Sequence, residues 1–136
     1  MSTITTTGTA TDSRPATRSD LALGVFRILV ALMFAMHGTM KLFGWPSGEA
    51  AAVGMWPVWW AGILEVVLGG LIAAGVLTRV AAFIASGMMA VAYWWMHFPD
   101  GFWPIVNGGE AAVLYCFLFL LLVFTGPGAL AVSRRF

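Results

Sequence analysis

Six ionisable side chains lie within or beside long apolar stretches of this sequence, and they are its main candidates for chemistry. They are Arg27, His37, Lys41, Glu65, His97 and Glu110. Charges at such positions are costly in a lipid environment, so they usually face the interior of a helix bundle and pair with one another. With the histidines neutral, the two bases Arg27 and Lys41 balance the two acids Glu65 and Glu110. This balance favours internal pairing over an ion pore lined by charges of one sign.

The depths of these residues predict which of them meet. We take Leu21 and Leu77 as the inner ends of the first two helices. At 1.5 Å per residue, Arg27 then lies about 9 Å deep, Glu65 about 18 Å and His37 about 24 Å. Glu65 is therefore within side-chain reach of Arg27 or His37. We predict a buried Arg27–Glu65 ion pair, with a structural or a functional role.

A second group is expected near the outer surface. His37 and Lys41 are four residues apart and share one helical face, and Glu110 begins another helix at the same level. Together with Glu65 they form a candidate polar site: His37, Lys41, Glu65 and Glu110. Two members have structural alternatives. Glu110 follows Asn107 at capping-box spacing, and Lys41 has a stem long enough to reach the lipid headgroups.

The elements that position these residues follow from composition. Of 136 residues, 60% are hydrophobic and 10% are charged, whereas a soluble domain carries about 25% charged residues. This excludes an ordinary soluble enzyme, and the net charge of +1 gives no basic field for nucleic acid. Four apolar stretches approach the roughly 20 residues needed to span a bilayer. They are Leu21–Leu42, Trp56–Leu77, Val80–Phe98 and Gly109–Thr125. We predict an all-α integral membrane protein, an antiparallel bundle of four transmembrane helices.

The ends and loops complete this organisation. Residues 1–20 are polar and Thr-rich, which predicts a disordered tail. The membrane domain covers 21–133, and 134–136 form a basic end. Thr78 is expected to cap the third helix. Lysine and arginine are biased to one side of the four-span order, which predicts a plasma-membrane protein with both termini in the cytoplasm. That side holds Arg14, Arg18, Arg79, Arg134 and Arg135, against Lys41 alone on the other.

Sulfur and indole side chains suggest further sites. The seven tryptophans gather towards the outer side, as an interfacial belt or as the lining of an aromatic cleft. Met36-His37 and Met96-His97 raise a Cu(I) hypothesis, because thioethers and imidazoles suit that ion. Methionine is also common filler in apolar helices, and we favour that interpretation and predict no metal site. Cys116 is expected to be a packing residue.

In its charged and glycine positions the sequence resembles the DoxX family of small four-helix membrane proteins. The resemblance covers about residues 21–133. The matching motifs are Arg27 before His37-Gly38-x-x-Lys41-Leu42, Glu65 with Gly69-Gly70, Gly75-x-x-Thr78-Arg79-x-Ala81-Ala82, Gly109-Glu110 and Gly126-x-Gly128. The order of these motifs over four spans is more specific than any one of them.

The resemblance implies a membrane subunit of an electron-transfer or oxidative-defence assembly, acting with partner proteins as part of a quinone-linked oxidoreductase. A quinone would be a bound ligand, and no covalent cofactor is expected. His37 and Lys41 would donate hydrogen bonds, Glu65 or Glu110 would relay protons, and tryptophans would line the ring. The alternative is a non-catalytic accessory protein that stabilises a larger membrane complex. A small-molecule or proton transporter, which would need oligomerisation, is a third hypothesis.

Overall fold

The computed structural model of the protein describes residues 15–133, and this part of the chain is helical. The helices are α1 (Arg18–Phe43), α2 (Val58–Ala74), α3 (Thr78–Ala92), the short α4 (Pro104–Asn107) and α5 (Glu110–Thr125). A π-helical turn (Tyr93–His97) and a 3-10 turn (Phe98–Asp100) extend α3. The predicted all-α class is confirmed.

The start of α1 corrects the predicted tail. Thr17 and Asp20 form a capping box, in which each side chain bonds the backbone N–H of the other residue. This arrangement satisfies N–H groups that a helix start otherwise leaves unpaired. The helix therefore begins at Arg18, inside the segment predicted to be disordered. Residues 1–14 and 134–136 lie outside the described part of the chain.

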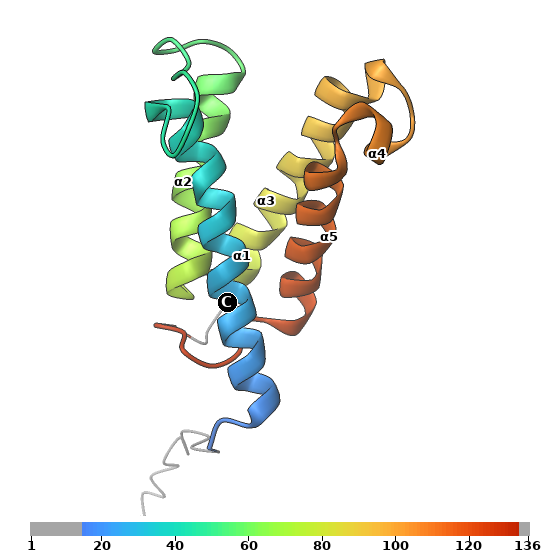
Figure 1. The fold of residues 1–136 in the computed structure, drawn as a ribbon. Coiled ribbons are helices and arrows are strands. Elements are labelled where there is room, and N and C mark those ends of the chain that lie inside the picture. The colour runs from blue at the N-terminus through green and yellow to red at the C-terminus, as the bar shows by residue number, and fades with distance from the viewer. Residues whose placement is uncertain (1–14, 134–136) are drawn as a thin grey trace, which may run out of the picture.

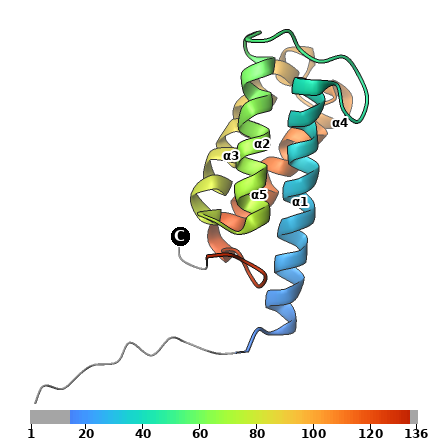
Figure 2. The ribbon, with the colours of Figure 1, turned by 90° about the vertical axis from the view of Figure 1, so that its left-hand side faces the viewer.

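The long helices form two pairs. α1 packs chiefly against α2, and α3 packs chiefly against α5, whereas α1 and α5 make few contacts. Figure 1 shows the two pairs close together near the C-terminal segment and diverging towards the opposite end, where the connecting segments 44–57 and 98–109 lie. We call this opposite end the loop end. In Figure 2, α1 also extends beyond the neighbouring end of α2.

Within residues 15–133, two helices are long and apolar enough to cross a membrane. They are Arg18–Phe43 and the extended helix Thr78–Asp100, of 26 and 23 residues. α2 and α5 are shorter apolar helices. Large apolar side chains are exposed on the outside of all four of these helices. Examples are Leu29 on α1, Val67 and Leu64 on α2, Phe83 on α3 and Phe117 on α5. Apolar exposure on this scale is typical of a protein in contact with lipid.

Glycines set the close packing of α1 on α2. A Cβ atom added at Gly38 would lie 2.6 Å from the Gly62 carbonyl oxygen, and one added at Gly69 would lie 2.9 Å from the Ala31 carbonyl oxygen. Small residues of this kind let helix backbones approach closely in membranes. These contacts also fix the register, because they place residues 62–66 of α2 level with Gly38 of α1.

We expect Gly38→Ala to destabilise the protein, whereas Gly70→Ala should not. The first change forces a methyl group against the backbone of α2, and such overpacking costs about 1–3 kcal/mol. A Cβ at Gly70 meets nothing within 4 Å, so that change should stabilise the helix by roughly 0.5–1 kcal/mol. Thermal unfolding in detergent compares the two. Equal melting temperatures would mean that the α1–α2 interface is looser than described.

The turn between α2 and α3 differs from the prediction for Thr78. Thr78 is the first residue of α3, and Leu77 occupies the N-cap position with a φ of 48°. Because Thr78 already has helical geometry, its side chain does not cap the helix. Its Oγ1 atom is buried without a hydrogen-bond partner.

Candidate functional site

A cavity of about 340 Å³ lies between the two helix pairs, and its walls come from α1, α2, α3 and α5 and from the adjoining turns. Most of the lining is apolar, including Phe34 and Met88. The ionisable and hydroxyl side chains on its wall are His37, Lys41, Glu65, His97 and Tyr115. The cavity therefore combines a few polar groups with apolar walls, as small-molecule sites usually do.

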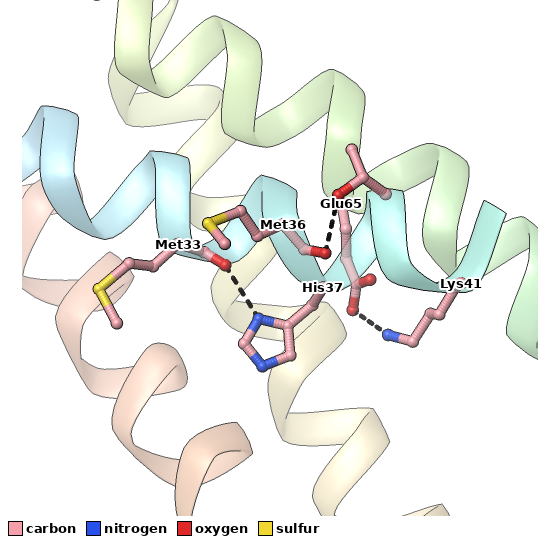
Figure 3. Close-up of polar contacts among 6 residues, drawn as sticks. Met33, Met36, His37, Lys41 and Glu65 are labelled. Carbon is pink, nitrogen blue, oxygen red and sulfur yellow. Dashed lines mark hydrogen bonds and ion pairs between the residues drawn. The ribbon is translucent and has the colours of Figure 1, made fainter. Parts of the chain in front are cut away.

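A buried ion pair forms one wall of this cavity. Lys41 Nζ donates to Glu65 Oε1, and Figure 3 shows the two side chains meeting between α1 and α2. The Glu65 side chain is 3% exposed and that of Lys41 is 26% exposed. Glu65 Oε2 is buried and has no hydrogen-bond partner. The prediction that Glu65 is buried and contacts the first helix is confirmed.

The predicted Arg27–Glu65 pair is wrong. Arg27 is fully buried, and its guanidinium donates to backbone carbonyls instead. The acceptors are Pro127, Ala129, Leu130 and Ala73. The error lies in the assumption that Leu21 and Leu77 are level. α1 extends beyond α2, so Gly75 lies beside Arg27 and Glu65 is ten residues further along α2, about 15 Å away.

His37 projects from α1 towards α5. Its Nδ1 atom lies 2.9 Å from the Met33 carbonyl oxygen, as Figure 3 shows. A carbonyl oxygen only accepts, so this contact assigns the proton to Nδ1 and leaves Nε2 as an acceptor. The ring also packs edge-to-face on Tyr115, with centroids 5.5 Å apart. This contact closes part of the wide gap between α1 and α5.

Glu110 does not join the other predicted site residues. It is exposed and lies outside the cavity lining. The buried face of α5 contains Ala112, Tyr115 and Phe119. Glu110 is two residues before Ala112, and therefore about 200° away around the helix. The predicted capping box is also absent at the start of α5, because the Asn107 side chain accepts from the Gly109 N–H instead.

Tyr115 is a polar residue of the cavity wall that was not predicted from the sequence. A hydroxylated aromatic residue in the middle of an apolar stretch was an available signal. His97 also lies on the cavity wall, where its Nδ1 atom is 3.2 Å from the Asn107 carbonyl oxygen.

The tryptophans do not line this cavity. Six of the seven are exposed by roughly half or more of their surface: Trp45, Trp56, Trp60, Trp94, Trp95 and Trp103. Trp94 and Trp103 line a separate apolar pocket of about 500 Å³ beside α3 and α5. The tryptophan positions therefore fit an interfacial belt better than a lining of the polar site.

Two comparisons with known proteins give a match. A family model described as DoxX matches residues 22–98, which contain His37, Lys41 and Glu65. A Haemophilus influenzae protein described as "Uncharacterized protein" is 45% identical over 120 residues, covering 84% of this chain and 90% of that protein. No solved structure matches the chain.

Proposed function

This chain belongs to the DoxX family, and from that premise we propose that it is a four-span subunit of a redox assembly in the bacterial plasma membrane. We propose that its cavity binds a quinone headgroup beside Lys41, Glu65 and His37. Its partners would be the lipid bilayer and the redox proteins that exchange electrons with the quinone.

Four spans are favoured by the antiparallel order of the long helices. α2 and α5 have 17 and 16 residues, or about 25 Å, close to the hydrocarbon thickness of about 30 Å. An even number of spans places both ends of the chain on one side. The arginine bias makes that side the cytoplasm, so the cavity lies in the outer half of the bilayer.

We expect cysteine labelling to show this orientation. In a Cys116→Ser background, Ser47→Cys should react with an impermeant maleimide added outside intact cells. Ser2→Cys should react only after the cells are opened. Labelling of both positions from the same side would exclude a chain with four spans and cytoplasmic termini.

The buried Lys41–Glu65 pair is the observation that supports a ligand site most directly. A lysine has three N–H donors, and Glu65 Oε1 accepts one of them. The remaining donors are available to a quinone carbonyl in a cavity whose walls are mostly apolar. Glu65 Oε2 has no partner and is placed to take or supply a proton. Cavities of about 300–1,000 Å³ are typical of small-molecule sites.

The accessory-protein alternative is favoured by a different observation. His37 bonds the carbonyl of its own helix, and Lys41 bonds Glu65. These polar groups therefore have partners without a ligand. In that case the Lys41–Glu65 pair would only join α1 to α2.

Quinone binding distinguishes the two functions. We expect a short-chain benzoquinol analogue, whose hydroxyl can donate to His37 Nε2, to bind the purified protein. His37→Ala should weaken this binding by about 1–3 kcal/mol, because that hydrogen bond is lost. Isothermal titration calorimetry measures both. Glu110→Gln is the matched control, because Glu110 is exposed outside the cavity, and its affinity should equal that of the wild type. Equal affinity in His37→Ala would favour the accessory function.

A further inference from the structure

A second pocket lies on another side of His37 and has different chemistry. It is open, has a volume of about 220 Å³, and is lined by Met33, Met36, His37, Met40 and Pro46. Three of the eight methionines of the chain therefore surround one imidazole. The ion pair and Tyr115 belong to the larger cavity and not to this one.

The helical repeat and the following loop bring these groups together. Met33, Met36, His37 and Met40 have the spacing i, i+3, i+4 and i+7, which places them on one face of α1. After α1 the chain turns at Gly44 with a φ of 70°, and this turn brings the loop back so that Pro46 closes one side of the pocket. The single Thr39 hydroxyl proton has two acceptors nearby, the Met36 and Trp45 carbonyl oxygens, at 3.0 and 3.1 Å from Oγ1.

The imidazole is prepared to act as a ligand. Its Nδ1–H donates to the Met33 carbonyl oxygen at 2.9 Å, so Nε2 keeps its lone pair. Histidines that bind metals generally donate their other N–H to a carbonyl or carboxylate in this way, which fixes the tautomer and the ring orientation. In Figure 3 the Met33 and Met36 side chains run along α1 with their sulfurs directed away from the His37 ring, so binding an ion would turn these flexible side chains towards Nε2.

We propose that this pocket is a Cu(I) site, with His37 Nε2 and the thioether sulfurs of Met33, Met36 and Met40 as the ligands. Thioethers are soft ligands that select Cu(I) among the common metal ions of cells, and imidazole suits copper as well. All four ligands are neutral, so a monovalent ion brings less charge into this apolar face than a divalent ion would. In the described part of the chain, no group of three histidine, cysteine, aspartate or glutamate residues could hold a metal, which separates this site from zinc chemistry.

Methionine filler, which we favoured from the sequence, explains each of these residues singly. It does not explain why three thioethers and a tautomer-fixed imidazole line the same opening. The pocket lies near the loop end of α1, where residues 44–46 follow, so an ion can reach it without crossing the larger cavity.

Cu(I) titration of the full-length protein in detergent tests this site. In the presence of ascorbate and a chromogenic Cu(I) chelator, we expect the wild type to take one Cu(I) per chain from the chelator. X-ray absorption of the loaded protein should show sulfur and nitrogen neighbours. The double variant Met36→Leu/Met40→Leu should bind at least about tenfold more weakly, since changes even to groups behind a metal's ligands cost 10–100-fold.

A matched control removes two thioethers elsewhere. Met88→Leu/Met96→Leu changes two residues of the larger cavity and should keep the wild-type affinity for Cu(I). Leucine is close to methionine in volume, so both double variants should fold, and an unchanged melting temperature of Met36→Leu/Met40→Leu in detergent would verify that the first one does. No Cu(I) uptake by the wild type would overturn the site. So would equal Cu(I) affinity in Met36→Leu/Met40→Leu.

Discussion

Arg27→Met is expected to lower the free energy of unfolding by at least about 3 kcal/mol. The guanidinium is fully buried and donates to four carbonyls, three of which belong to the segment after α5. Each buried acceptor that loses its partner costs about 1–3 kcal/mol. The same change frees residues 127–132, which run beside the end of α2 and donate to it from the Val132 N–H to the Ala74 carbonyl oxygen. Unfolding in a titration with a denaturing detergent measures the loss.

Arg79→Met is the matched control for Arg27→Met. Arg79 is also an arginine that donates to backbone carbonyls, those of Val123 and Phe124, but it is exposed. Water replaces its hydrogen bonds, so the expected cost is about 1 kcal/mol or less. Similar losses in the two variants would contradict the structural role assigned to Arg27.

Lys41→Met is expected to lower the free energy of unfolding by a similar amount, about 3–5 kcal/mol. Removing one partner of a buried ion pair leaves the other charge without compensation, and losses of this size are typical. Lys41→Met leaves the buried Glu65 carboxylate without a partner, whereas Glu65→Gln leaves only the partly exposed Lys41 ammonium group without one. The loss should therefore be larger for Lys41→Met than for Glu65→Gln. Exposed Glu49 provides the control: Glu49→Gln should change stability by less than about 0.5 kcal/mol.

The double variant Lys41→Met/Glu65→Gln measures how much the two charges stabilise each other. It removes both charges, so it should recover part of the stability that Lys41→Met loses. A double variant whose loss equals the sum of the two single losses would show that the charges do not interact. The Lys41–Glu65 contact would then give no reason to place a ligand beside it.

The burial of Glu65 could be predicted from the sequence, because Gly69 and Ala73 continue its helical stripe and only a protein-facing carboxylate avoids the cost of lipid. The ion-pair partner of Glu65 could not be predicted from the sequence. Choosing between Arg27, His37 and Lys41 needs the register of α1 against α2, and a shift of one helical turn, about 5 Å, changes the answer. That register depends on Gly38 and Gly69 contacting the opposite backbone.

The errors at Arg27 and Glu110 have different causes. Three of the four acceptors of Arg27 are backbone carbonyls 100 to 103 residues later in the chain, and no side-chain pattern indicates them. Glu110 has the right depth but points away from the cavity, because depth along a helix does not fix direction around it. The positions of Ala112 and Tyr115, which lie on the buried face of α5, indicate which way each side chain of that helix points.

Purification of the protein from native membranes tests the quinone site most directly. The wild type, extracted in mild detergent and analysed by mass spectrometry, should carry close to one quinone per chain. His37→Ala should carry much less, and Glu110→Gln should match the wild type. Wild-type protein that co-purifies with redox partners but carries no quinone would contradict the site and would support the accessory function instead.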